Sequence, residues 1–279
     1  MNKADTPPAP AAGVKPVMLI TGAAGGLGRA LARAAARQYR LALLDQRDSA
    51  GVALADELRQ GGAEVLFLNA DVSDERQMRQ AVERIERRWG RLDVLINNAG
   101  LAAAGPFEAL DNTGWQTLWN VNVMGAVHGC QAALRLMKPQ GDGHLVNVAA
   151  LPGISAPPGM ASYVACNAAL IGLSEALAAE LEGLGVAVSV VCPDWFASDL
   201  ARHMCDSDPL SRARLERALL RAPDPVERLA AHILKALASR PLYIFPQPEA
   251  QREWRRKRRN PLRFVRRMRS LARRLRRYR

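Results

Sequence analysis

Residues 17–28, VMLITGAAGGLG, join a short apolar run to a cluster of glycines, and this segment decides the fold. Val17–Thr21 predicts a buried strand, and the following stretch rich in Ala, Leu and Arg predicts a helix as far as about Gln38. The glycines permit a tight turn and let backbone N–H groups approach a pyrophosphate closely. The amino end of the helix adds partial positive charge at that point. The segment therefore predicts a dinucleotide-binding loop rather than a plain glycine-rich turn, because an acid closes the next predicted strand.

The alternation of strand and helix continues along the chain. Helical stretches are predicted to end near Gln60, to span Asp74–Trp89 and Ala161–Leu181, and to begin at Thr113 and Pro225. The further predicted strands are Leu41–Leu44, Glu64–Asn69, Leu92–Ile96, Leu145–Val148, Val186–Val191 and Leu242–Phe245. Strands that alternate with helices favour a parallel sheet covered on both faces. We expect an α/β fold: a doubly wound parallel sheet of Rossmann type, in a single domain of about seven strands, with a basic C-terminal helix.

Two of these helices have recognisable starting signals. Thr113, with Gln116 three residues later, forms a candidate capping box. Asp224 precedes Pro225, and proline is favoured at the first helical position. Both signals predict where the chain enters a helix after a loop.

Charge is distributed unevenly along the 279 residues. The formal net charge is +12, but residues 251–279 contain 15 Arg and Lys against one acid, Glu253, and so carry +14. The preceding 250 residues carry −2. We expect a flexible N-terminal tail at 1–15, a dinucleotide-binding domain at 16–250, and a basic amphipathic tail at 251–279.

Several classes of protein are disfavoured by the composition. No run of 18 apolar residues predicts a membrane-spanning helix, and the Pro- and Ala-rich start lacks the apolar core of a signal peptide. The four cysteines match no zinc or C-x-x-C spacing, and the four histidines are scattered, so no metal site is expected. These features predict a cytoplasmic protein with reduced thiols.

Asp45 stands at the end of the second predicted strand. A carboxylate there can accept hydrogen bonds from both hydroxyls of an adenosine ribose, and it repels a 2′-phosphate. This favours NAD(H) over NADP(H), although Arg47, two residues on, softens the preference. The alternative is that Asp45 only caps the next turn.

Several motifs, spread over about residues 15–245, together resemble the short-chain dehydrogenase/reductase family. They are T-G-x-x-x-G-x-G at Thr21, Gly22, Gly26 and Gly28; Asp71-Val72 after the third strand; N-N-A-G at Asn97–Gly100; Trp115 followed by Asn122; and Tyr163. The resemblance implies an oxidoreductase acting on an alcohol or carbonyl, assembled as a homo-oligomer through the helices near Thr113 and Ala161. It implies cofactor contacts from Thr21, Gly22, Gly26, Leu27, Gly28, Asp45, Asp71, Val72, Asn98, Ala99, Gly100, Tyr163, Asn167, Pro193 and Ser198.

The same resemblance implies that Tyr163 is the catalytic acid/base and that Asn122 anchors a relay water. In the family a serine about 13 residues before the tyrosine positions the substrate oxygen, and a lysine four residues after it lowers the tyrosine pKa. This chain has Ala150 and Asn167 at those degenerate positions. A third departure is Asp194, where the family has glycine beside the nicotinamide.

Two functions therefore remain open. One is an NAD-dependent oxidoreductase of low or altered activity; the other is a catalytically inactive dinucleotide-binding scaffold or sensor. A cation or a hydroxyl facing Tyr163 would support the enzyme, because one positioned proton-transfer group is worth about 10²–10⁴ in rate. An apolar, uncharged site would support the scaffold. The stretch 199–223, with Met204 and Leu210, is compatible with an apolar or acyl substrate.

The basic tail contains a second pattern. Asn260-Pro261 is a favourable helix start, with a capping residue followed by proline. After it, an apolar stripe recurs at spacings of four and three residues: Phe264, Met268, Leu271, Leu275 and Tyr278. A basic helix with such a stripe favours an anionic membrane surface, held peripherally. Docking on its own domain or on a dimer partner is the next interpretation, and nucleic acid is the least expected partner.

Overall fold

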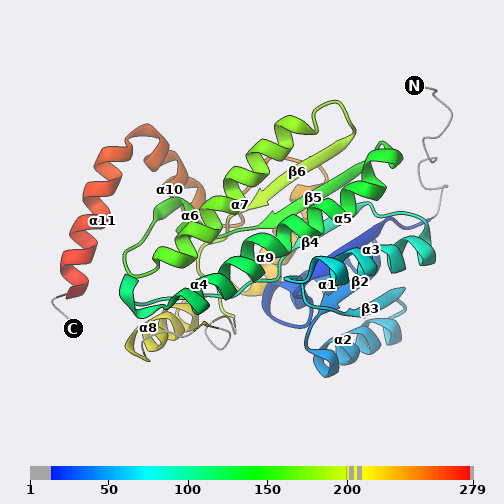
Figure 1. Cartoon of the computed structure of the whole chain (residues 1–279), viewed down its shortest axis with the longest axis horizontal. Coiled ribbons are helices and arrows are strands. Elements are labelled where there is room, and N and C mark those ends of the chain that lie inside the picture. The colour runs from blue at the N-terminus through cyan, green and yellow to red at the C-terminus, as the bar shows by residue number, and fades with distance from the viewer. Residues whose placement is uncertain (1–13, 199, 201–203, 206–208, 277–279) are drawn as a thin grey trace.

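Seven parallel strands form one sheet in the order β3-β2-β1-β4-β5-β6-β7 (Figure 1). The computed structural model describes residues 14–198, 200, 204–205 and 209–276. The strands are β1 (Val17–Thr21), β2 (Arg40–Asp45), β3 (Val65–Asn69), β4 (Val94–Asn97), β5 (Gly143–Val148), β6 (Val186–Val191) and β7 (Tyr243–Ile244). Every residue of β1 is buried, as expected for a central strand with helices on both sides. The doubly wound α/β prediction is confirmed.

Helices cover both faces of the sheet. On one face lie α1 (Gly26–Ala35), α2 (Asp48–Gln60) and α9 (Val226–Leu237), which share an apolar core with β1 and β2. On the other face lie α3 (Glu75–Trp89), α5 (Gly125–Gln140) and α7 (Ala161–Glu180). The chain changes direction of winding at β1, which pairs with β2 on one side and β4 on the other. Such a switch opens a crevice at the carboxyl ends of the strands.

The remaining elements line that crevice or lead away from it. A π-helical turn at Asn120–Met124 joins α4 (Asn112–Trp119) to α5, and a 3₁₀ turn lies at Phe107–Ala109. The others are α6 (Leu151–Ser155), α8 (Pro209–Leu220), α10 (Pro248–Arg259) and α11 (Pro261–Arg276). Most of the predicted N-terminal tail, residues 1–13, and the last residue of the apolar stripe, Tyr278, lie outside the described residues.

Two predicted helix starts are wrong by one or two residues. Asp111 caps α4, because its carboxylate accepts a hydrogen bond from the Gly114 N–H at 2.7 Å, so Thr113 and Gln116 form no capping box. The acid two residues earlier is the cap because its side chain satisfies an otherwise unpaired helix N–H. Pro225 is itself the cap residue of α9, which begins at Val226, one residue later than predicted.

The helix α7 is long and apolar enough to cross a membrane, judged by length and composition alone. It packs on β6 and β5 and supplies buried residues to the protein interior. A helix that belongs to a protein core passes the same test, so this feature carries no argument for a membrane span.

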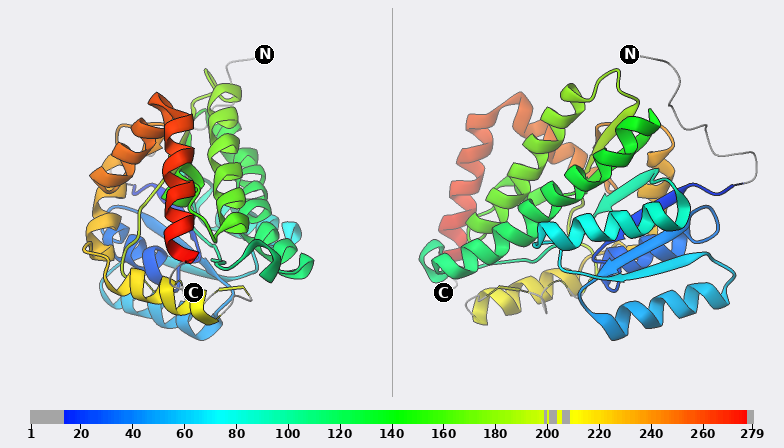
Figure 2. Two further views of the ribbon diagram at one scale, coloured as in Figure 1. Left: turned by 90° about the vertical axis from the view of Figure 1, so that its left-hand side faces the viewer. Right: turned by 45° about the vertical axis from the view of Figure 1, so that its right-hand side comes forward.

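The basic C-terminal segment forms two helices rather than one. The first, α10, crosses the expected boundary at residue 250 and packs on the domain: Ala250 is fully buried, and the Trp254 ring lies 5.2 Å from that of Tyr243. Lys257 Nζ donates to the Ile154 carbonyl at 2.6 Å, which ties α10 to α6. Figures 1 and 2 show α11 as the outermost element at this end of the molecule.

The apolar stripe of α11 turns inward at its start. Asn260 caps the helix as predicted, its Oδ1 accepting from the Arg263 N–H at 2.9 Å. Phe264 is only 5% exposed, and Met268 and Leu271 are half-buried; the side chain of Leu275 is not described. Glu253 on α10 pairs with both Arg256 and Arg267, and so holds α11 against α10. The outward face instead exposes Leu262 and Val265 among arginines.

Candidate dinucleotide and catalytic site

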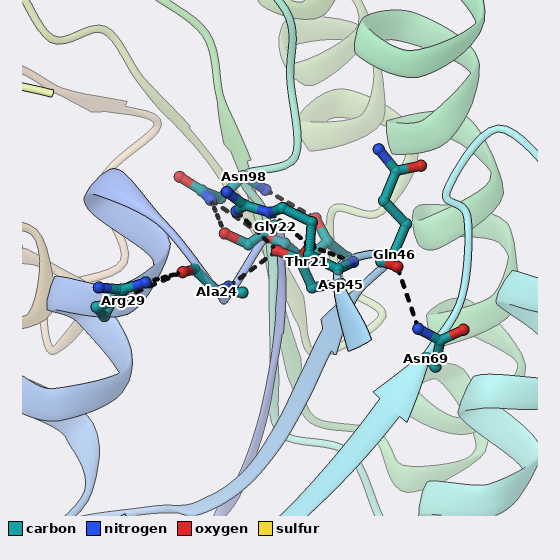
Figure 3. Close-up of polar contacts among 9 residues, drawn as sticks. Thr21, Gly22, Ala24, Arg29, Asp45, Gln46, Asn69 and Asn98 are labelled. Carbon is teal, nitrogen blue, oxygen red and sulfur yellow. Dashed lines mark hydrogen bonds and ion pairs between the residues drawn. The ribbon is translucent and has the colours of Figure 1, made fainter. Parts of the chain in front are cut away.

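The loops after β1 and β4 are joined by hydrogen bonds at the switch point. Thr21 Oγ1 accepts from the Asn98 N–H at 3.0 Å and from the Ala99 N–H at 3.1 Å. Asn98 Nδ2 donates back to the Thr21 carbonyl at 2.9 Å (Figure 3). The two loops therefore form one rigid edge of the crevice, and the helix α1 begins directly beside it.

Glycine is required in this loop for close backbone approach. A Cβ on Gly28 would lie 2.2 Å from the Gly22 carbonyl oxygen, and Gly22 itself has a φ of +63°. Both positions exclude a side chain for steric reasons. The glycines therefore specify the packing of the loop, which lines the cleft and leads directly into the amino end of α1, where helix N–H groups favour an anion.

Asp45 holds the other side of the loop. Its Oδ2 accepts from the Ala24 N–H at 2.9 Å (Figure 3). Its Oδ1 accepts from the N–H of Arg47 at 2.9 Å. Arg47 Nε also donates to Oδ1, at 3.1 Å. Burial raises the pKa of Asp45, but the bonds from Arg47 and Ala24 outweigh burial and hold that pKa below its usual range. The carboxylate is thus ionised, and it accepts hydrogen bonds from the backbone on both sides of the cleft edge.

The predicted cofactor residues gather along a single cleft. The predicted residues that line this cleft are Gly22, Gly26, Leu27, Asp45, Asp71, Val72, Asn98, Ala99, Gly100, Tyr163, Asn167, Pro193 and Ser198. Thr21 and Gly28 are not among its lining residues and instead support the loop through their packing. The cleft runs from Asp45 to the end containing Tyr163, which matches the extended shape of a dinucleotide. The residues present therefore fit a nicotinamide dinucleotide.

Asn122 occupies the π-helical turn and lines the same cleft. Its Oδ1 accepts from the Leu101 N–H, and its Nδ2 donates to the Leu101 carbonyl, both at 2.8 Å. The side chain is 6% exposed. Its amide therefore positions the loop after β4.

Tyr163 lies in apolar surroundings. It is 8% exposed and packs with Ala102, Ala150, Met160, Met204, Leu215 and Leu219. Burial raises the pKa of the Tyr163 phenol to about 12, and a hydrogen bond from Asn167 opposes this only in part. Ala150 offers no hydroxyl. Of the described residues that line the cleft, Arg47 is the only cation, and it lies beside Asp45.

Two further polar groups lie near this end: Gln247, which the sequence analysis did not predict, and Ser198, which it predicted only as a cofactor contact. Gln247 is 3% exposed and holds the turn at Asp194, accepting from the Asp194 N–H at 2.9 Å. No motif marks a glutamine in a loop before a helix, so sequence analysis missed it. Ser198 Oγ is buried without a hydrogen-bond partner in the described part of the chain. Within that same part, no cluster of three His, Cys, Asp or Glu residues is arranged to hold a metal.

Comparisons with known proteins agree with this geometry. The family model described as short chain dehydrogenase matches residues 16–208. The chain is 32% identical over 252 residues to a CLA biosynthesis dehydrogenase/reductase of Lactiplantibacillus plantarum, covering 84% of this chain and 88% of that protein. It is 32% identical to a cyclopentanol dehydrogenase of Comamonas testosteroni, with coverages of 76% and 85%. A short chain dehydrogenase/reductase from Burkholderia phymatum, solved in complex with NAD, superposes with a TM-score of 0.82 at 29% identity, covering 86% and 92%.

Tyr163 is expected to stay protonated at pH 10, where an exposed tyrosine is half ionised, because its pKa is raised to about 12. Asn167→Lys should lower this pKa by about 1–3 through the nearby positive charge. The measurement is a pH titration of ¹³C-labelled tyrosine by NMR, with Tyr163→Phe to assign the signal and Asn167→Met as the neutral control. A wild-type Tyr163 that ionises below pH 10 would mean that a cation reaches its hydroxyl.

Proposed function

Because the chain belongs to the short-chain dehydrogenase family, we propose that it is an NAD(H)-dependent oxidoreductase for an alcohol or carbonyl substrate, with low or altered activity. The observation that carries the proposal is a single cleft with two different ends. An ionised Asp45 stands at one end, and Tyr163 stands at the other, where no described cleft-lining residue is a cation. The first feature supports cofactor binding. The second supports weak proton transfer.

The cofactor preference follows from Asp45. Its carboxylate can accept from the ribose hydroxyls of NAD(H) once Arg47 yields one of its bonds, whereas the 2′-phosphate of NADP(H) would meet a negative charge. The glycine loop and the amino end of α1 would hold the pyrophosphate. When bound, the cofactor supplies or accepts the hydride.

The state of Tyr163 favours reduction over oxidation. With a pKa near 12, only about one phenol in 10⁵ is ionised at pH 7, so a base for alcohol oxidation is scarce. The protonated phenol can still donate to a carbonyl oxygen. The absent serine hydroxyl at position 150 removes a second donor, which costs about 10²–10³ in rate by analogy with lost oxyanion donors.

The alternative is a dinucleotide-binding scaffold or sensor without catalysis. The apolar surroundings of Tyr163 support it, since Ala150 offers no hydroxyl and the only cation among the described cleft-lining residues, Arg47, lies at the Asp45 end. The enzyme remains our main proposal because the relatives are oxidoreductases and the chain retains the tyrosine. Turnover measurements separate the two.

Further parts of the proposal concern substrate and assembly. Trp195, Leu200 and Leu219 line the cleft and belong to the same apolar cluster as Tyr163, which supports an apolar substrate. The name of one relative, a cyclopentanol dehydrogenase, agrees with a small apolar alcohol. We also propose a cytoplasmic homo-oligomer formed through α4, α5 and α7, as the family resemblance implies.

The basic helices α10 and α11 support peripheral binding to an anionic membrane. Because Phe264 is buried, the contact would use the outward face of α11, where Leu262 and Val265 stand among arginines. Each basic residue near an anionic leaflet contributes about 1 kcal/mol at best, and salt screens that contribution. Nucleic acid remains the least expected partner.

NADH is expected to bind at least about tenfold more tightly than NADPH, because Asp45 repels the 2′-phosphate. Asp45→Asn removes the charge while keeping an acceptor for the Ala24 N–H, and Asp45→Ala removes both. Each variant should reduce the difference between the affinities for NADH and NADPH. Isothermal titration calorimetry on the purified protein measures both affinities. Equal affinities in the wild type, or tighter NADPH binding, would remove this assignment.

Restoring Ala150→Ser together with Asn167→Lys is expected to raise ketone reduction by up to about 10²–10⁴, because it returns a hydroxyl donor and a cation to Tyr163. Alcohol oxidation should also begin at lower pH, since the lysine lowers the pKa of the base. Steady-state assays measure both effects, and adding Tyr163→Phe should abolish the gain. No gain with cofactor still bound would locate the block at Asp194 or in the substrate pocket.

Full-length protein is expected to co-sediment with vesicles of phosphatidylserine and phosphatidylcholine, less so as salt rises. Leu262→Ser with Val265→Ser should weaken binding without changing Tm, because both side chains are exposed. Phe264→Ser is the matched control and should lower Tm by removing an internal contact. Loss of vesicle binding in Phe264→Ser at unchanged Tm would show that the stripe enters lipid, and stronger binding to random duplex DNA would favour nucleic acid.

A further inference from the structure

Asp194 stands in the cleft at the end of β6. It follows Pro193, whose carbonyl accepts from the Leu151 N–H at 2.8 Å, so the chain segments after β5 and β6 remain side by side. Asp194 lines the same cleft as Ala149, Ala150 and Tyr163. The carboxylate therefore belongs to the end of the cleft where proton transfer is expected, opposite the Asp45 end.

A buried amide holds the backbone of this turn. Gln247 accepts from the Asp194 N–H at 2.9 Å, and its Nε2 donates to the Trp195 carbonyl at 3.2 Å. Gln247 is 3% exposed and immediately precedes α10. Both bonds use the backbone at 194–195, so the position of the turn does not depend on the Asp194 side chain.

The negative charge of Asp194 is poorly compensated by the described protein. Its Oδ1 accepts from the Trp195 N–H at 2.8 Å, and no ion pair to it occurs among the described residues. Burial raises the pKa of Asp194, and the nearby carboxylates of Glu249, Glu253 and Asp224 raise it further. A half-buried carboxylate in such surroundings is stabilised by a ligand that brings a positive charge.

We propose that Asp194 makes the site select the oxidised cofactor, NAD⁺, over NADH. The inference rests on the proposed function, because hydride transfer requires the nicotinamide near Tyr163. The two oxidation states differ by one positive charge, which is carried by that ring. An opposite charge in the same cleft favours the cationic ring and gains nothing from the neutral one.

The consequence is a shift in the redox balance of the bound cofactor. A tenfold preference for NAD⁺ lowers the two-electron midpoint potential of the bound couple by about 30 mV. For an enzyme that reduces a carbonyl, the oxidised cofactor would be the more tightly held product. For a scaffold without catalysis, the fraction of protein that holds a cofactor would follow the concentration of NAD⁺ rather than that of NADH.

The test uses full-length protein and calorimetry with NAD⁺, NADH and ADP-ribose, which lacks the nicotinamide. Asp194→Asn is expected to weaken NAD⁺ binding about tenfold while NADH and ADP-ribose change less than about twofold. Glu249→Gln is the matched control, an acid that acts on Asp194 without lining the cleft, and should change each affinity less than about threefold. Asp194→Gly keeps both backbone bonds to Gln247 and serves if the asparagine variant does not fold.

The outcomes separate the two proposals. If ADP-ribose binds the wild type but Asp194→Asn and Asp194→Gly leave the ratio of NAD⁺ to NADH affinity unchanged, the role of Asp194 is overturned and dinucleotide binding stands. If the wild type does not bind ADP-ribose, NAD⁺ or NADH, the proposed function fails, and the role of Asp194 fails with it.

Discussion

The hydrogen bonds between Thr21 and the Asn98–Ala99 backbone are the constraint on which the rest of the site depends. They join the loops after β1 and β4 at the point where the winding of the sheet reverses. The carboxyl ends of all the parallel strands lie at the same edge of the sheet, so the position of these two loops sets the floor of the cleft. The glycine loop, Asp45 and the π-helical turn of Asn122 are then placed around it by short bonds of their own.

The two ends of the cleft differ in how they are built. At one end the charge of Asp45 has partners, because its carboxylate accepts from Arg47 and Ala24. At the other end Tyr163 is surrounded by apolar side chains, and Asp194 has neighbours of its own sign. The first arrangement suits binding of a dinucleotide. The second keeps the phenol protonated, and the proposal of low or altered activity rests on that state.

Much of the fold was predictable because its signals are local. Buried parallel strands are continuous apolar runs, and glycines mark the loop after β1, so the strands along the chain and the line of candidate cofactor residues followed from the sequence. Tertiary packing decided the rest. Asp111, not Thr113, caps α4. Gln247, which is 53 residues from Asp194 in the sequence, accepts a hydrogen bond from its N–H. Phe264 on α11 is buried although the stripe could equally have faced a membrane. The contact of Gln247 with Asp194 leaves no spacing signal, and the periodic stripe at Phe264 does not say which surface covers it.

The central claim is that the chain keeps the dinucleotide end of the site and, among its described residues, lacks a cation at Tyr163. A crystal structure of the full-length protein with NAD⁺ tests it most directly, through the distance from the Tyr163 hydroxyl to the nearest Lys or Arg nitrogen. The account predicts adenosine ribose hydroxyls bonded to Asp45 and no such nitrogen within about 6 Å of the phenol. A lysine or arginine bonded to Tyr163, or a ribose remote from Asp45, would contradict it.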